Sequence, residues 1–149
     1  MGELIVKSTG GTNIKLELSD RLTFIGGESG SGKTYMIRTI KGVSRNSSSL
    51  KESNIDVSRF VIIEDENSLQ LKAIKDGSVV LIDRYDCFSQ AAKKSIWNKM
   101  KKVKATWIVM TRSADFPAWS GFSLRSFKTL ECKHKRNGRD ITLRTKYYK

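Results

Sequence analysis

Short stretches of strand character open the chain and enclose a turn signal. Leu4-Ile5-Val6 is apolar, and Ile14-Lys15-Leu16-Glu17-Leu18 alternates between apolar and polar side chains, which is the period of a strand. Gly10-Gly11-Thr12-Asn13 lies between them, so residues 1–18 predict a β-hairpin. A third strand is predicted over residues 22–25, where Gly26-Gly27 ends it.

The middle of the chain alternates between apolar runs and segments with helical spacing. Continuous apolar runs predict buried, parallel strands, and these runs cover residues 60–63, 79–82 and 107–110. Helical spacing predicts one helix over residues 33–42, a short helix near residues 69–74 and another helix from about Ser89 to Val103. Polar composition predicts loops over residues 43–54 and 115–121.

The C-terminal segment alternates again, on both sides of Asn137-Gly138. This dipeptide is the strongest short hairpin signal, so residues 127–148 predict a second hairpin. Strands that alternate with helices predict a parallel sheet with a ligand site at the carboxyl ends of its strands. We therefore expect residues 1–149 to form a single three-layer α/β domain, with a parallel core sheet and antiparallel strands added at the N- and C-terminal ends.

Composition fits one ordinary globular domain. The chain has 149 residues, of which 38% are hydrophobic and 29% charged. No window approaches the roughly 18 consecutive apolar residues of a membrane span, and the first residues lack the apolar core of a signal peptide. Cys87 and Cys132 have no metal-ligand spacing, which predicts buried thiols in a cytoplasmic protein.

A formal net charge of +13 is concentrated in two segments. The first holds Lys93, Lys94, Lys99, Lys101, Lys102 and Lys104. The second runs from Arg125 to Lys149 and has nine Lys or Arg against Glu131 and Asp140. Basic surfaces attract polyanions, so a nucleic acid or an acidic protein is a candidate partner at both segments. The alternative is a solvated surface that only maintains solubility.

A glycine-rich motif follows the third predicted strand and opens the first predicted helix. It consists of Gly27, Glu28, Ser29, Gly30, Ser31, Gly32, Lys33 and Thr34, and Tyr35 follows it. Each fixed position of G-x-x-x-x-G-K-[ST] is matched. Glycines allow the backbone to approach phosphate oxygens, and N–H groups at a helix N-terminus bind anions. The motif predicts ATP with Mg²⁺, with the Lys33 ammonium on the β- and γ-phosphates and the Thr34 hydroxyl on the metal.

An aspartate ends the apolar run over residues 79–82. A buried strand that delivers one carboxylate beside a phosphate loop is the Walker B arrangement, so Asp83 is predicted to help bind Mg²⁺. A helix-capping role is the alternative for this side chain.

Together these features resemble the P-loop NTPases, most closely the branch that contains the ABC and AAA-type ATPases. The resemblance rests on the hairpin before the loop, the motif sequence GESGSGKT and the extra apolar run over residues 107–110. It implies a P-loop fold in which this last strand lies between the phosphate-loop strand and the Walker B strand. It also implies that a polar residue after this strand, here Thr111 or Arg112, contacts the γ-phosphate or the attacking water.

Two departures from this family pattern bear on catalysis. No L-S-G-G-Q-like signature is present, so the resemblance does not support a paired ABC dimer. Arg84 stands where a glutamate usually follows the Walker B aspartate. Glu64 after the run over residues 60–63, or Asp86, is the candidate base, and slow or partner-dependent hydrolysis without a base is the alternative.

Other functions remain open at this point. Asp83-Arg84-Tyr85 also resembles the D-R-Y element of thymidylate kinases, which implies phosphate transfer to a nucleoside or nucleotide. A module that binds ATP without hydrolysis is a further alternative. The ATPase is also a candidate for a nucleotide-dependent oligomer. An N-K-x-D element for guanine is absent, which favours ATP over GTP.

Overall fold

A computed structural model describes residues 2–18, 21–26, 32–111 and 126–147. Strands dominate this part of the chain, and only two α-helices accompany them. The elements are β1 (Glu3–Ser8), β2 (Thr12–Glu17), β3 (Leu22–Gly26), α1 (Lys33–Arg45), β4 (Leu50–Ser53), β5 (Phe60–Ile63), β6 (Val79–Ile82), α2 (Gln90–Lys102), β7 (Thr106–Met110), β8 (Ser126–Lys135) and β9 (Gly138–Tyr147). Short 3₁₀ turns occupy much of the remainder, including Glu66–Ser68, Leu71–Ala73 and Tyr85–Cys87.

All nine strands of the described residues join in one mixed sheet, in the order β4-β1-β2-β9-β8-β3-β7-β6-β5. β5, β6, β7, β3 and β8 run parallel to one another. β9 is antiparallel to β8 and parallel to β2, while β1 is antiparallel to both β2 and β4. Five of the nine strands therefore come from the two ends of the chain and from β4, namely β1, β2, β4, β8 and β9. The prediction had these end strands only as additions to a parallel core.

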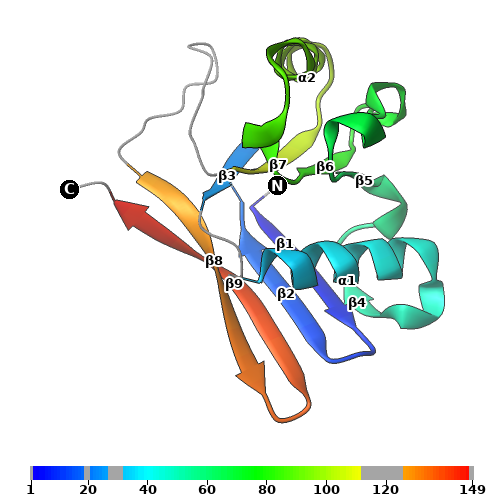
Figure 1. Ribbon diagram of the computed structural model, residues 1–149. Coiled ribbons are helices and arrows are strands. Elements are labelled where there is room, and N and C mark those ends of the chain that lie inside the picture. The colour runs from blue at the N-terminus through cyan, green and yellow to red at the C-terminus, as the bar shows by residue number, and fades with distance from the viewer. Residues whose placement is uncertain (1, 19–20, 27–31, 112–125, 148–149) are drawn as a thin grey trace.

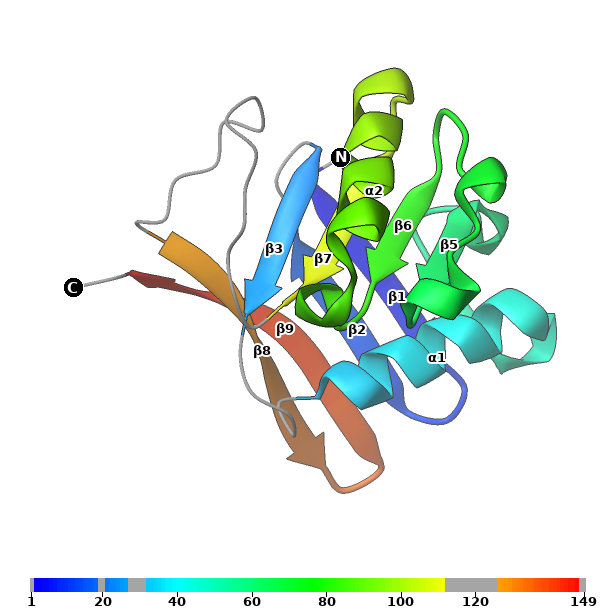
Figure 2. The ribbon, with the colours of Figure 1, turned by 45° about the horizontal axis from the view of Figure 1, so that its top comes forward.

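The predicted three-layer α/β fold with a parallel core sheet is wrong. Figures 1 and 2 show a sheet that curls into a half-barrel instead of spreading flat between two helical layers. The burial pattern gives the physical reason. β1 and β2 bury alternate residues and so have one apolar face, whereas β6 and β7 bury every residue. A twisted sheet with one apolar face over much of its width curls around that face.

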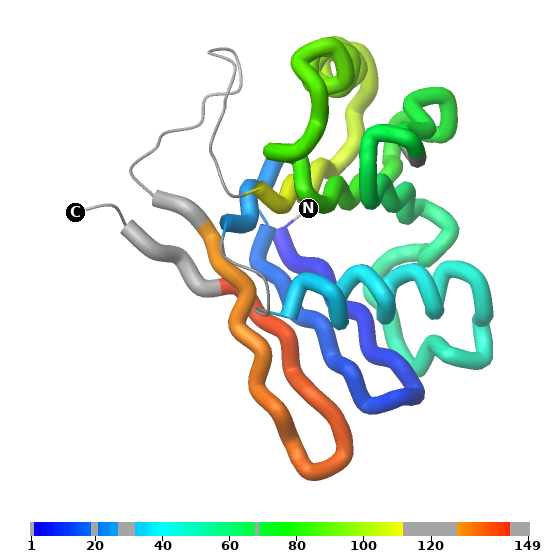
Figure 3. The backbone as a smooth tube through the Cα atoms, in the orientation of Figure 1, coloured from blue at the N-terminus to red at the C-terminus, as the bar shows by residue number. Residues whose placement is uncertain are grey.

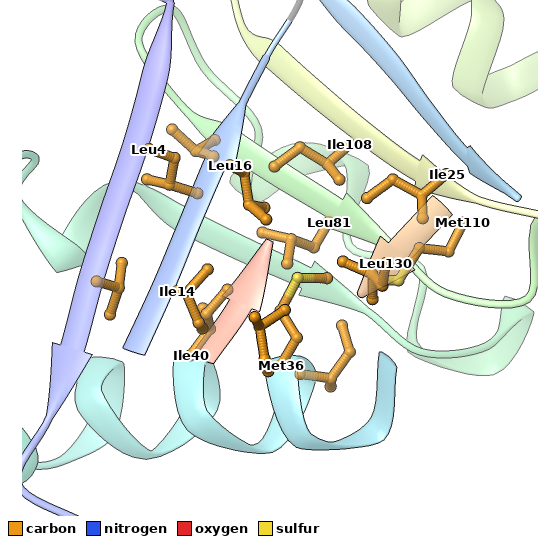
Figure 4. Close-up of a cluster of buried hydrophobic side chains, with 14 of the residues drawn as sticks. Leu4, Ile14, Leu16, Ile25, Met36, Ile40, Leu81, Ile108, Met110 and Leu130 are labelled. Carbon is orange, nitrogen blue, oxygen red and sulfur yellow. The ribbon is translucent and has the colours of Figure 1, made fainter. Parts of the chain in front are cut away.

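Helix α1 lies inside the curl and holds the larger core together. Its buried residues are Met36, Ile37, Ile40 and Val43. Figure 4 shows Met36 and Ile40 pointing from α1 toward strand residues such as Leu81 and Leu130. This core joins β1 and β2 to β3, β6, β7, β8 and β9, so α1 fixes both halves of the sheet relative to each other.

Helix α2 packs on the opposite face of β3, β6 and β7. Ile96 and Met100 meet Phe24, Val80 and Trp107 in a second core. The Ser89 hydroxyl accepts the Ala92 N–H at 3.1 Å and caps this helix, as its predicted start requires. Neither α-helix in the described part of the chain has the length and apolar character of a membrane span.

Several local predictions are confirmed, and others are wrong. The two hairpins, the three parallel strands and the position of β7 between β3 and β6 are confirmed. β6 and β7 are fully buried as predicted, whereas β5 lies at the edge of the sheet and buries only Ile63. The predicted loop over residues 43–54 is wrong, because α1 continues to Arg45 and Leu50–Ser53 forms β4 against β1. Turns of 3₁₀ type replace the short helix predicted near residues 69–74. Cys87 is exposed and Cys132 only partly buried, so the prediction of two buried thiols is also wrong.

The turns of the two hairpins meet edge to edge. Gly11 has φ +90°, and a β-carbon on it would overlap the Asn137 carbonyl oxygen, while one on Gly138 would overlap the Gly11 backbone. The Arg139 N–H also donates to the Gly11 carbonyl at 3.0 Å. Only glycine leaves room for this contact. As Figure 3 shows, the β8–β9 hairpin runs alongside β1 and β2 and extends to the edge of the molecule.

Candidate active site

Three polar residues follow three neighbouring parallel strands. Glu64, Asp83 and Thr111 come directly after β5, β6 and β7. The Asp83 N–H donates to the Ile63 carbonyl at 2.8 Å, and the Thr111 N–H donates to the Ile25 carbonyl at 3.0 Å. The ladder of parallel strands thus brings the three side chains to one edge of the sheet, where open α/β sheets bind ligands.

Helix α1 begins beside this edge. Gly32 has φ +103° and ψ −2°, a left-handed conformation, and its carbonyl accepts the Met36 N–H at 3.0 Å. This conformation suits glycine and turns the chain into the helix. Lys33 is partly buried and Thr34 is exposed in the first turn. Gly27, Glu28, Ser29, Gly30 and Ser31 lie outside the described residues.

A cavity of about 740 Å³ lies between α1 and these strand ends. Its lining consists of Lys33, Thr34, Ile37, Arg38, Lys41, Gly42, Arg45, Glu64, Asp83, Arg84, Asp86, Cys87, Met110 and Thr111. Six residues singled out from the sequence share this cavity: Lys33, Thr34, Glu64, Asp83, Asp86 and Thr111. Gly32 and Tyr35 do not line it, and Arg112 lies outside the described residues.

Tyr35 faces the β8–β9 hairpin. The Arg139 guanidinium lies 3.6 Å from the centre of the Tyr35 ring. The His134 ring packs edge-on against the same ring, with 6.4 Å between the two ring centres. A cation over an aromatic face is attracted by the ring quadrupole. Tyr35 therefore ties the first turn of α1 to the hairpin, a contact that its place beside the motif does not predict.

Three cations that line the far part of this cavity were not among the predicted site residues. Arg38, Lys41 and Arg45 follow Thr34 at intervals of four, three and four residues along α1. This spacing places them on the helix face of Thr34, and from it the three cations could have been predicted as cavity residues. Lys41 donates to the Glu64 carboxylate at 2.8 Å. Glu64 is thus held in a defined position at the cavity wall.

Arg84 has an unusual backbone. Its φ of 50° and ψ of 44° lie in the left-handed region, and no other described residue except glycine has a positive φ. Two hydrogen bonds hold the turn: the Arg84 N–H donates to Asp83 Oδ1 at 2.9 Å, and the Cys87 N–H donates to the Arg84 carbonyl at 2.9 Å. The Asp83 carboxylate is thereby fixed at one oxygen by the chain that follows it.

A second contact fixes the segment between β6 and α2, and it comes from Glu66 in the 3₁₀ turn after β5. The Ser89 N–H donates to Glu66 Oε1 at 2.6 Å. This backbone hydrogen bond, followed by the bond from the Ser89 side chain, lowers the pKa of the Glu66 carboxyl. The carboxylate therefore stays ionised and holds the start of α2 beside the turn that carries Asp86.

Thr34 and Asp83 suit a magnesium ion bound together with a triphosphate. A hydroxyl and a carboxylate oxygen are ligands that Mg²⁺ prefers, and its remaining positions are usually filled by phosphates and water. Within the described residues, no three His, Cys, Asp or Glu side chains gather as a metal site would require. The donor set of Thr34 and Asp83 therefore fits a metal that arrives with a nucleotide.

No protein-family model matches this chain, and no curated protein is significantly similar to it. The interpretation of the cavity therefore depends on the motif over residues 27–34 and on the positions of the side chains described above. Of these, the shared position of Lys33, Thr34 and Asp83 is the most informative, because their predicted roles require them to be close.

Proposed function

We propose that the protein binds Mg-ATP in this cavity and hydrolyses it. The observation that carries the proposal is that one cavity is lined by Lys33 and Thr34 from the start of α1 and by Asp83 from the end of β6. The phosphate-loop motif and the apolar strand before Asp83 were identified separately in the sequence, 50 residues apart. Their meeting is what binding of a metal-bound triphosphate requires.

Each of these residues has a distinct role in binding. The Lys33 ammonium neutralises charge on the β- and γ-phosphates, and the N-terminus of α1 adds its dipole. Thr34 and Asp83 would hold Mg²⁺, which neutralises charge on the phosphate oxygens. Thr111 is buried at the end of β7, where its hydroxyl can meet the γ-phosphate or the attacking water.

Hydrolysis is a transfer of the γ-phosphoryl group to water. The water oxygen forms a bond to the γ-phosphorus as the bond from that phosphorus to the β,γ-bridging oxygen breaks, which releases ADP and phosphate. The water loses one proton, so a base in the cavity favours the reaction. Glu64 and Asp86 both line the cavity. We favour Glu64, because it follows the strand next to Asp83 and Lys41 holds its carboxylate.

Hydrolysis would act on a partner through the basic surfaces. The first turn of α1 contacts the β8–β9 hairpin at two points: Tyr35 meets Arg139, and Gly32 lies against Cys132. The exposed residues Lys133, Lys135 and Arg136 lie on the same hairpin. A nucleotide at Lys33 can therefore influence the surface offered to a polyanion, in the manner of nucleotide switches. A nucleic acid is the partner class that such a basic surface fits best.

Phosphate release from Mg-ATP tests this function. The wild type is assayed alone and with single-stranded DNA, duplex DNA or RNA, beside Lys33→Ala and Asp83→Asn. We expect Lys33→Ala to lose triphosphate binding and Asp83→Asn to lose turnover by roughly 10²-fold or more, as removal of a group that stabilises transition-state charge does. Matched substitutions outside the cavity, Lys51→Ala and Asp76→Asn, serve as controls.

The outcomes separate the alternatives. Equal ATP affinity in Lys33→Ala and wild type would show that the nucleotide site is elsewhere. ATP binding without turnover under every condition would leave the binding module and the kinase, and a screen of nucleoside acceptors would then separate these two. Turnover that rises with one nucleic acid would identify that polymer as the partner.

A further inference from the structure

The proposed hydrolysis leaves three arginines of the cavity without a role. Arg38 and Arg45 on α1 and Arg84 after β6 all line the cavity and are all exposed. Within the described ranges, none of them forms an ion pair with a carboxylate, whereas Lys41 pairs with Glu64. The cavity therefore has positive charge beyond what its own acidic residues neutralise.

Position along α1 separates Arg45 from a nucleotide at the loop. An α-helix rises 1.5 Å per residue, so Arg38 lies about 6 Å and Arg45 about 16 Å along the axis from Thr34. Phosphates held by the loop and by Lys33 lie at the first turn. Arg45 is thus about three helical turns from these phosphates, although it lines the same cavity.

The row of cations on α1 also carries a small electrostatic cost without an anion. Like charges three and four residues apart on one helix face repel each other, which is the relationship of Arg38, Lys41 and Arg45. Arg84 keeps a left-handed backbone that L-residues rarely adopt. Residues held in such conformations cluster at ligand sites. An anion between α1 and the turn after β6 would relieve the repulsion.

We propose that Arg38, Arg45 and Arg84 bind the phosphate group of a second ligand, a small phosphate monoester, beside the nucleotide. Guanidinium groups match phosphate oxygens with paired hydrogen bonds. A concave site of about 740 Å³ is of the size that small molecules occupy, and a polymer requires an open groove instead. The proposal depends on the proposed function only because it places the nucleotide at the other end of the cavity.

Calorimetric titration with glycerol 3-phosphate tests this site. The protein is first saturated with Mg²⁺ and a non-hydrolysable ATP analogue, so that the phosphate loop is filled. We expect the wild type to bind glycerol 3-phosphate and not glycerol. In Arg38→Gln with Arg45→Gln, the affinity for glycerol 3-phosphate should fall by about tenfold or more, because charge-assisted hydrogen bonds are lost. The affinity for the analogue should fall much less.

A charge-matched variant and a loop variant complete the test. Lys51→Gln with Lys72→Gln removes two exposed charges outside the cavity, and it should keep the wild-type affinity for glycerol 3-phosphate. Lys33→Ala, titrated without analogue, should also keep it, so failure of the nucleotide site would not obscure the result. Absence of binding to the wild type, or equal loss in the charge-matched variant, would overturn the proposal. Binding of a short oligonucleotide in place of glycerol 3-phosphate would overturn it in favour of a polymer.

Discussion

Gly32, the last glycine of the phosphate-loop motif, lies directly against Cys132 of β8. A β-carbon on Gly32 would be 3.0 Å from the Cys132 Cβ, and Gly32 has φ +103°. Two independent reasons therefore favour glycine at this position, the left-handed backbone and the neighbouring strand.

Gly32→Ala is accordingly expected to destabilise the protein and weaken ATP binding. The left-handed backbone alone costs an L-residue roughly 1–2 kcal/mol. Gly42→Ala is the matched substitution on the same helix, where a β-carbon would meet nothing within 4 Å. It should stabilise the protein by up to about 1 kcal/mol, because alanine favours a helix interior. Denaturant unfolding measures both effects, and a stable Gly32→Ala would contradict this account.

The catalytic base is tested by a pair of isosteric substitutions. Glu64→Gln should lower kcat for ATP hydrolysis by about 10²-fold, within the range for loss of a general base. Asp86→Asn should have a smaller effect, and both variants should keep their affinity for ATP. The reverse order would assign the base to Asp86. Full activity in both would indicate hydrolysis without a carboxylate base.

The lysine segment of α2 contributes to a partner surface only where it is exposed. Lys94 and Lys102 are exposed, so Lys94→Glu with Lys102→Glu should weaken nucleic-acid binding, most of all at low salt. On a plot of log affinity against log salt, the slope should become shallower by about 0.9 for each lost phosphate contact. Unchanged affinity across the salt series would mean that these lysines serve solubility alone.

Lys93 belongs to the core and not to that surface, contrary to its assignment from sequence. It is 8% exposed, and its ammonium lies 5.1 Å from the centre of the Tyr85 ring. Lys93→Glu would bury a negative charge against the electron-rich face of the ring, so we expect a loss of about 2 kcal/mol or more in unfolding free energy. Lys94→Glu should change it by less than about 0.5 kcal/mol. Equal stability of the two variants would contradict the position of Lys93.

Asp140 should make the β8–β9 hairpin sensitive to acid. Hydrogen bonds from Lys135 and then from Asn13 lower the pKa of the Asp140 carboxyl below its ordinary value of 3.8. Because its pKa is lower in the folded state, the ionised carboxyl stabilises the fold at pH values above 3.8. This stabilisation is lost as the pH falls through the pKa of the folded state. Asp140→Asn should therefore reduce stability near neutral pH and flatten the acid limb. Unfolding measured at about pH 6 and about pH 3 compares the two proteins.

Local patterns predicted the parts of the fold that depend on neighbours in sequence. The continuous run Val79–Ile82 predicted a strand buried on both faces, and Asn137-Gly138 predicted the turn of the C-terminal hairpin. The gathering of Thr34 and Asp83 followed as well, because parallel strands place their carboxyl ends at one edge.

Features that depend on distant partners could not be predicted in this way. β4 has one apolar residue, Leu50, and becomes a strand only because β1 offers it an edge. The curl of the sheet depends on α1 packing against strands from both ends of the chain. The burial of Lys93 likewise depends on Tyr85, whose ring is brought there by the turn after β6.

The pairing of β3 with β8 is the shortest strand pairing in the described sheet. Within the described residues this pairing has two register positions, Ile25 with Lys128 and Gly26 with Thr129. β3 also pairs with β7 over four residues, and β8 with β9 over ten. A sheet yields most easily where the fewest backbone bonds cross it. The weakest seam of this half-barrel therefore ends at Gly26, directly before the glycine-rich motif.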